Sequence, residues 1–293
     1  MNSFAAEVER VWPGRGARFE PLGGGITNHN LKVEVDGERY VLRVAGKDTN
    51  LLGIDRSVEL AATERAAALG IGPEVVDFVR PEGWLVTRFI EGEIPPIERM
   101  REPEILARVA SALSRFHGAH GASIPGAFSS FRVVELYRQT ALERGGTVPV
   151  PYEWAHEIAR RIESKRASAR SAPCHNDLLN ANFLDDGERL RIVDWEYAGM
   201  GDRFFDLANF SINHELDGAQ SEALLSAYFG EARQEDLQAL ALMRFMSDFR
   251  EAMWGVVQSA VSELDFDFDS YASEHFERLR LTAESHAFAA ALA

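Results

Sequence analysis

The chain has 293 residues, of which 46% are hydrophobic and 10% aromatic, a composition that excludes a disordered protein. Acidic residues outnumber basic ones by 46 to 31, which gives a formal net charge of −15 at pH 7, and no basic cluster is longer than Arg160-Arg161. A nucleic-acid partner is therefore not expected, and a cationic partner fits the charge better.

Residues 1–92 are expected to form a small lobe that combines an antiparallel sheet with a helix. Strand-like patterns cover residues 19–22, 29–35 and 39–44. Asp36-Gly37 is typical of a hairpin turn between the second and third strands. A helix over residues 56–69 stops at Gly70, and two more strands follow at residues 74–79 and 84–89.

Residues 93–293 are expected to form a larger, mostly helical lobe. Gly92 and the paired prolines Pro95-Pro96 predict a linker between the lobes. Helical patterns then cover residues 104–120, 131–144, 153–169, 204–213, 219–228, 235–262 and 270–293. The length of the chain agrees with one large two-lobed unit or with two domains.

The sequence shows no targeting signal and has a single cysteine, so we expect a cytoplasmic protein. The first residues do not combine a positive region with an apolar run, and no segment approaches 18 consecutive apolar residues. We therefore expect no membrane insertion. Cys174 is the only cysteine, so an intrachain disulfide bond is excluded. The sequence carries no signal for the oligomeric state.

The most informative segment is residues 175–182, His-Asn-Asp-Leu-Leu-Asn-Ala-Asn, which precedes an apolar strand that ends at Asp194. Phosphoryl transfer needs a carboxylate near the attacking hydroxyl and oxygen ligands that hold Mg²⁺ against the phosphates. Asp177 is the candidate catalytic base, and Asn182 and Asp194 are the candidate metal ligands. A polar loop whose side chains only cap turns is the alternative for any one of them, but not for all three in this order.

The pattern H-x-D-x-x-x-x-N, followed by an apolar strand ending in Asp, resembles the catalytic loop and metal-binding Asp of the protein kinase-like phosphotransferases. Asn176 stands where protein kinases have Arg, and Asp194-Trp195-Glu196 replaces their Asp-Phe-Gly. Both differences favour the small-molecule branch, which comprises the choline/ethanolamine kinases and the aminoglycoside phosphotransferases. The resemblance implies an α+β, bilobal protein kinase-like fold with a small antiparallel-sheet N-lobe and a larger, mostly helical C-lobe, and it implies ATP and Mg²⁺ as cofactors.

A glycine-rich segment between the first two predicted strands is the candidate phosphate-covering loop. Glycines let a backbone approach phosphates closely. The G-G-x-T-N pattern before a strand resembles the corresponding loop of choline kinase-like enzymes, whereas a glycine-rich turn by itself is more often only flexible. The resemblance implies nucleotide binding by Gly23, Gly24, Gly25, Thr27 and Asn28.

Arg43 ends the third predicted strand, where kinases carry the lysine that contacts the α- and β-phosphates and choline kinases commonly carry arginine. A guanidinium group can form paired hydrogen bonds to phosphate oxygens. Glu59, near the start of the following helix, resembles the acidic partner that orients this cation. Glu64 is the rival partner, and a solvent-facing helix charge is the alternative interpretation of Glu59.

The last third resembles the tail of choline/ethanolamine kinases. In that family, aromatic rings at the positions of Trp254 and Tyr271 surround a quaternary ammonium, a contact of about 0.5–2 kcal/mol per ring. Glu251 stands where the family often has a second tryptophan, and a carboxylate there favours an ammonium with N–H donors, such as ethanolamine. Glu196 and Tyr197 resemble the family's loop after the metal Asp and complete the predicted substrate-binding set. Core packing is the alternative for Trp254 and Tyr271.

The resemblance implies ATP-dependent phosphorylation of the hydroxyl of a small cationic amino-alcohol, choline or ethanolamine. A kinase of an aminoglycoside, thiamine or a sugar with the same fold is the nearest alternative, and a catalytically inactive cation-binding module is the alternative of another class. Asp206 resembles a structural Asp that braces the catalytic loop. His175 is expected to support the loop rather than to act as the base.

Overall fold

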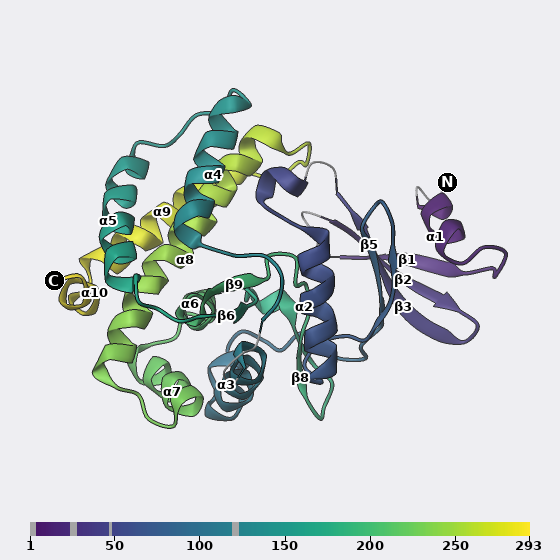
Figure 1. Ribbon diagram of the computed structural model, residues 1–293, viewed down its shortest axis with the longest axis horizontal. Coiled ribbons are helices and arrows are strands. Elements are labelled where there is room, and N and C mark those ends of the chain that lie inside the picture. The colour runs from purple at the N-terminus through teal and green to yellow at the C-terminus, as the bar shows by residue number, and fades with distance from the viewer. Residues whose placement is uncertain (1–3, 24–27, 47–48, 119–122) are drawn as a thin grey trace.

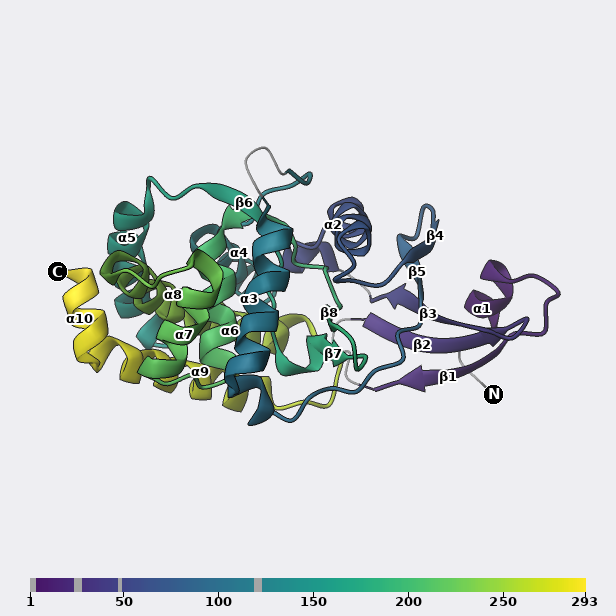
Figure 2. The same ribbon diagram turned by 90° about the horizontal axis from the view of Figure 1, so that it is seen from below.

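The computed structural model describes residues 4–23, 28–46, 49–118 and 123–293. A part built on a β-sheet lies beside a larger helical part, as Figure 1 and Figure 2 show from two directions. The predicted fold class is confirmed, because the antiparallel sheet comes from the N-terminal part of the chain and the helices dominate the rest.

Five antiparallel strands form the sheet in the order β1-β2-β3-β5-β4. The strands are β1 (Arg18–Leu22), β2 (Asn28–Val35), β3 (Glu38–Ala45), β4 (Val75–Val79) and β5 (Trp84–Arg88). Each lies within one residue of its predicted bounds. Asp36 and Gly37 both have positive φ angles, 52° and 81°, as the predicted tight hairpin turn requires.

Two helices accompany the sheet. The short helix α1 (Ala5–Val11) was not predicted, because seven residues are too few to show a helical period; Val8 and the following Trp12 pack against Leu31 and Val33 of β2. Helix α2 (Arg56–Ala68) lies where the sheet meets the helical part (Figure 1). It begins at Asp55, whose side chain accepts a hydrogen bond from the Ser57 N–H at 2.8 Å.

The helical part contains most of the hydrophobic core. Its helices are α3 (Pro103–His117), α4 (Ser130–Glu143), α5 (Pro151–Arg166), α6 (Arg203–Asn213), α7 (Gly218–Phe229), α8 (Gln234–Val261), α9 (Phe268–Glu284) and α10 (His286–Leu292). The prediction of one continuous helix from residue 270 to the end was wrong. Ser285 is extended and its hydroxyl caps the N-terminus of α10, accepting from Phe288 N–H at 3.2 Å.

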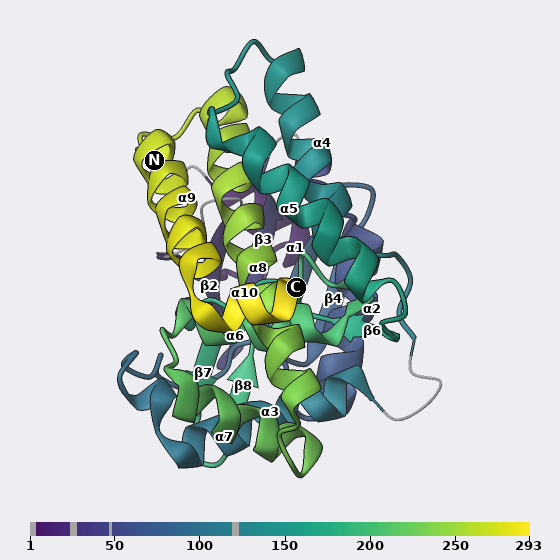
Figure 3. The same cartoon turned by 90° about the vertical axis from the view of Figure 1, so that its left-hand side faces the viewer.

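Helix α8 is the central element of the helical part, and Figure 3 shows it surrounded by other helices. It packs against α4, α6 and α9. Every residue of the stretch 245–258 is buried, so this half of the helix has no solvent-facing side. The predicted acceptor residues Glu251 and Trp254 lie in this stretch.

In the part of the chain that the structure describes, two small antiparallel sheets and three 3₁₀ helices lie outside the five-stranded sheet and the α-helices. β6 (Ser171–Cys174) pairs with β9 (Gly199–Asp202), and β7 (Phe183–Asp185) pairs with β8 (Leu190–Ile192). Single 3₁₀ turns lie at η1 (Thr49–Leu52), η2 (Arg99–Arg101) and η3 (Asn180–Asn182). In the linker after β5, the Glu93 N–H donates to the Asp185 carbonyl at 3.1 Å, and the Asp185 N–H donates back at 2.9 Å. Within the described ranges, no helix combines the length and apolarity needed to cross a bilayer.

A buried histidine makes stability depend on pH. His214 is fully buried after α6, its Nδ1–H donates to the Phe210 carbonyl at 2.9 Å, and burial lowers the pKa of His214 to about 4. An unfolded histidine titrates near pH 6.5. Between these pH values the unfolded chain therefore binds the extra proton, and the stability present above about pH 6.5 is lost as the pH falls toward 4.

We expect the unfolding free energy of the protein to fall by about 2 kcal/mol more between pH 7 and pH 5 than that of His214→Asn, which has no titratable group at this position. Urea unfolding at the two pH values measures the difference. An identical pH dependence in both proteins would show that His214 is not the group responsible.

Candidate active site

The predicted catalytic loop follows β6 and is held by the buried side chain of Asp206 in α6. Asp206 Oδ2 accepts the His175 N–H at 2.8 Å, and Oδ1 accepts the Asn176 N–H at 2.7 Å. Asn176 has a φ of 68°, a left-handed conformation that few non-glycine residues adopt. The prediction that Asp206 braces the loop is confirmed. Two backbone donors and one carboxylate thereby fix the residue directly before Asp177.

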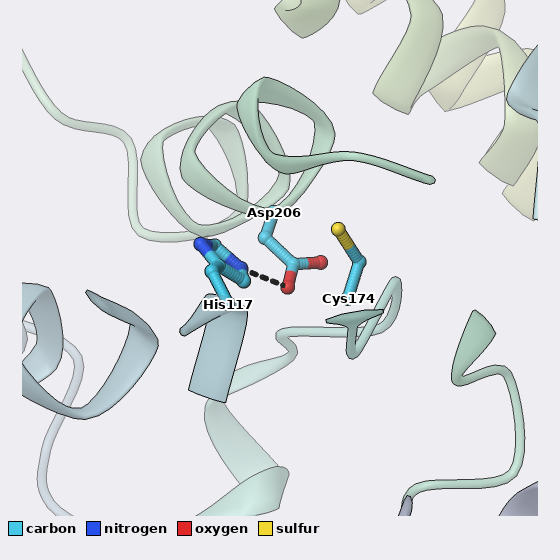
Figure 4. A group of neighbouring side chains, drawn as sticks. All are labelled: His117, Cys174 and Asp206. Atoms are coloured by element: carbon cyan, nitrogen blue, oxygen red, sulfur yellow. Dashed lines mark hydrogen bonds and ion pairs between the residues drawn. The ribbon is translucent and has the colours of Figure 1, made fainter. Parts of the chain in front are cut away.

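Asp206 also joins His117 and Cys174 in a group with the composition of a metal site (Figure 4). His117 Nε2 lies 3.0 Å from Asp206 Oδ2, which already accepts a backbone N–H, and the Cys174 thiol donates to the Ala172 carbonyl at 3.4 Å. Burial raises the pKa of Cys174 well above its usual value, which disfavours the thiolate that a metal requires. We interpret the group as a hydrogen-bonded support for the loop.

Replacing Asp206 with Asn is expected to destabilise the protein by about 3 kcal/mol, because an amide group cannot accept all three donors in this buried position. Burial opposes ionisation of Asp206, but the hydrogen bond and charge of His117 and the backbone donor of His175 hold the pKa of the carboxyl below its usual range. Urea unfolding measures the loss. Glu222→Gln on the exposed side of α7 is the control, and equal stability of the two variants would contradict the bracing role.

Asp177 and Asn182 are in direct contact. Asn182 Nδ2 donates to the Asp177 carbonyl oxygen at 2.8 Å and lies 3.4 Å from its Oδ2. The Val193 N–H donates to the Asn182 carbonyl at 2.9 Å, which places Asp194 one residue away from this contact. Because the Asn182 amide nitrogen is used in this way, its side-chain oxygen is the atom available as a ligand.

His175 connects the two segments and does not occupy the position of the base. Its Nδ1 accepts the Asp177 N–H at 3.2 Å, and its Nε2–H donates to the Val193 carbonyl at 3.0 Å. Burial lowers the pKa of His175, which favours the neutral ring that this arrangement requires. Asp177 is itself buried, and burial raises its pKa to about 7, with the charge of Arg250 opposing the rise.

A cavity of about 560 Å³ lies between the sheet and the loop region. Its polar lining includes Arg43, Asn182 and Asp194, and its apolar lining includes Val41 and Leu85. Polar groups that converge at one side of an apolar cavity are typical of a binding site for an organic ligand with a charged end. The oxygen donors of Asn182 and Asp194 have the chemistry that Mg²⁺ prefers.

Arg43, which lines the cavity, forms two ion pairs. One is with Glu59, which is 1% exposed, and the other joins Arg43 Nη1 to Asp194 Oδ1 at 2.6 Å. The structure thus pairs Arg43 with Glu59, the predicted partner, whereas the rival Glu64 is exposed. Arg43 connects α2 to the segment that carries Asp194.

The predicted phosphate-covering loop is only partly within the described residues. Gly23 lines the cavity, whereas Gly24, Gly25 and Thr27 lie outside the described ranges. Asn28 is buried; its Nδ2 donates to Glu196 Oε2 at 2.7 Å, and its Oδ1 accepts Arg56 Nη2 at 2.7 Å. Asn28 therefore has two protein partners, Glu196 and Arg56. Glu196, which was predicted to bind the acceptor, pairs with Asn28 and Arg56 rather than with the aromatic residues around Trp254.

The remaining predicted acceptor residues meet in one cluster, although they come from three segments. The Trp254 indole N–H donates to the Tyr197 hydroxyl at 3.1 Å, and the Tyr271 hydroxyl donates to Glu251 Oε2 at 2.9 Å. The rings of Trp254 and Tyr271 have centroids 5.4 Å apart. These polar contacts distinguish the cluster from simple core packing.

Two arginines of the site, Arg56 and Arg250, were not among the residues predicted from the sequence. Arg56 Nη1 lies 2.7 Å from Glu59 Oε2 and 3.2 Å from Glu196 Oε2. Arg250 Nη2 lies 3.1 Å from Asp177 Oδ1. An arginine at the start of a helix usually lies at the surface, and no local pattern marks either residue as buried. Only the position of Arg250 beside Glu251, in a stretch with few other charges, offered a signal.

Comparison with known proteins identifies the family of the chain. Residues 18–242 match the family model described as "Phosphotransferase enzyme family". The solved structure of a choline/ethanolamine kinase family protein from Mesorhizobium loti is 33% identical, with a TM-score of 0.82 over 98% of this chain and 96% of that one. Protein LicA of Haemophilus influenzae is 25% identical over 87% of this chain and 76% of its own length, and human ethanolamine kinase 2 is 25% identical over 93% and 78%.

The chain therefore belongs to the phosphotransferase enzyme family, as its fold and the residues around the cavity indicate. Within that family it belongs to the choline/ethanolamine kinase group, so the resemblance inferred from the motifs is confirmed.

Proposed function

We propose that the protein transfers the γ-phosphoryl group of ATP to the hydroxyl of a small amino-alcohol, choline or ethanolamine. The observation that carries the proposal is the contact between Asp177 and Asn182, at a point where Asn182, Asp194 and Arg43 line one cavity. A base candidate next to a set of oxygen ligands and a phosphate-binding cation is the arrangement that phosphoryl transfer requires.

The nucleotide is expected to bind in the 560 Å³ cavity between the sheet and the loop region. Its apolar walls suit the base, and the Arg43 guanidinium suits phosphate oxygens. Asn182 and Asp194 would hold Mg²⁺, which when bound neutralises phosphate charge and aligns the phosphates. Glu59 keeps Arg43 oriented toward this end of the cavity.

Asp177 is the proposed base, and its two carboxylate oxygens have different surroundings. Oδ1 is held by Arg250 at 3.1 Å, whereas among the described residues Oδ2 has only the long 3.4 Å contact with Asn182. Oδ2 is therefore the oxygen that would accept a hydrogen bond from the acceptor hydroxyl. Positioning that hydroxyl in line with the γ-phosphate is the main contribution required of the base.

The acceptor is proposed from the cluster around Trp254. The aromatic rings of Trp254 and Tyr271, whose centroids lie 5.4 Å apart, suit the ammonium group of an amino-alcohol. The relatives whose names include ethanolamine kinase or choline/ethanolamine kinase support the same class. The overall charge of −15 also favours a cationic substrate.

Asp177→Asn is expected to lower kcat by about 10²–10⁴-fold while leaving nucleotide affinity nearly unchanged, because the amide cannot act as a base but preserves the shape of the side chain. A coupled assay of ADP release with choline, ethanolamine, thiamine and kanamycin measures both the activity and the acceptor class. Glu222→Gln, a substitution at an exposed position of α7, is the control and is expected to keep the wild-type kcat. Undiminished turnover by Asp177→Asn would remove this residue from the mechanism, and turnover confined to thiamine or kanamycin would reject the amino-alcohol.

Asp194→Asn is expected to abolish the dependence of ATP affinity on Mg²⁺, because a neutral amide is a poorer ligand for a hard divalent cation. Calorimetric titration of ATP with Mg²⁺ and with EDTA gives the two affinities for each protein. We expect Mg²⁺ to tighten ATP binding by the wild type only. If Mg²⁺ tightened binding equally in the variant, Asp194 would not be a ligand.

A further inference from the structure

Arg250 lies inside the proposed acceptor site and is 1% exposed. Its Nη2 donates to the Asn176 carbonyl and to Asp177 Oδ1, both at 3.1 Å, and its Nη1 pairs with Glu251 Oε1. One guanidinium thus connects the proposed base to the carboxylate of the acceptor cluster.

The same guanidinium lies over an aromatic ring. Its Cζ is 4.6 Å from the centroid of the Tyr197 ring, within the range of a cation–π contact. Tyr197 accepts the indole N–H of Trp254, one helical turn after Arg250 on α8. One face of Tyr197 is therefore in contact with a cation that belongs to the protein itself.

Glu251 has little capacity left for a substrate. Its Oε1 pairs with Arg250, and its Oε2 accepts the Tyr271 hydroxyl. The side chain is 2% exposed. Glu251 therefore acts together with Arg250 as a pair, rather than as an isolated negative charge that faces the acceptor.

We infer that Arg250 determines acceptor specificity: its guanidinium, held on the Tyr197 ring between Asp177 and Glu251, excludes quaternary ammonium acceptors in favour of primary amines. The inference rests on the proposed function. A quaternary ammonium forms no N–H hydrogen bonds and depends on aromatic faces. Here one such face carries a fixed like charge, which repels it at short range.

A primary ammonium avoids this conflict. Its N–H donors bind oxygen acceptors in general, so it does not depend on the Tyr197 face. Arg250, Asp177 and Glu251 together carry one more negative than positive charge when both carboxylates are ionised, which still attracts one positive charge. Selection would therefore depend on the shape and hydrogen bonding of the ammonium group rather than on its charge alone.

The test compares the ratio of kcat/KM for ethanolamine to kcat/KM for choline in the full-length protein and four variants. Arg250→Met with Glu251→Gln removes one cation and one anion, since loss of the arginine alone would leave two buried carboxylates without a counterion. Glu251→Gln alone isolates the contribution of the carboxylate. Arg250→Lys retains the positive charge. Arg244→Met, six residues earlier on α8 and bound to Ser211 and Leu216, is the matched control.

The wild type is expected to prefer ethanolamine, and the double variant to lose roughly tenfold of that preference, in line with the strength of one cation–π contact. Glu251→Gln, Arg250→Lys and Arg244→Met are expected to keep it. A purely structural role of Arg250 would lower stability without changing the ratio. A wild type that prefers choline, or a folded double variant with the wild-type ratio, overturns the inference.

Calorimetric titration with choline gives a readout that does not need turnover. If neither amino-alcohol is phosphorylated, the proposed function fails, but the role of Arg250 is still decided by binding. Roughly tenfold tighter choline binding by the double variant than by the wild type supports the inference, and equal binding overturns it. Circular dichroism monitors folding. Should the double variant not fold, Arg250→Gln combined with Glu251→Gln replaces it, with the same expected and contradicting results.

Discussion

The proposed chemistry depends on one buried carboxylate, that of Asp206. It accepts the backbone N–H groups of His175 and Asn176 and lies within hydrogen-bond distance of His117. A buried carboxylate without such partners would be costly, so the partners and the charge stabilise one another. The consequence is a loop whose backbone conformation is fixed immediately before Asp177. Asn182 and Arg250, which contact the proposed base, are positioned against that loop.

Charges of opposite sign alternate through the buried centre of the molecule. Arg43 lies between Glu59 and Asp194, and Arg250 lies between Asp177 and Glu251. Each cation has two anionic partners, so removing the arginine leaves two carboxylates without their counterion. The first group joins β3 and α2 to the segment that carries Asp194. The second group joins the catalytic loop to α8.

Much of the fold followed from local patterns. The five strands of the N-terminal sheet were predicted within one residue because their alternation and the Asp36-Gly37 turn are local features. Helix α1 and the break at Ser285 were missed, since both depend on a few residues that show no clear period. In the site, the spacing of Asp177, Asn182 and Asp194 reflects a loop followed by a hairpin, so their convergence was predictable.

The sequence by itself determined the fold class and the family, because these are encoded in contiguous segments, and it led to the prediction of Asp177, Asn182 and Asp194 as site residues. Only the tertiary structure decided that Glu59 rather than Glu64 pairs with Arg43, and that Glu196 lies with Asn28. It alone brought Arg250 against Asp177, 73 residues earlier in the chain. Whether two charged residues far apart in the sequence form an ion pair depends on which helix faces pack against each other in the folded protein. A local sequence pattern does not show this packing.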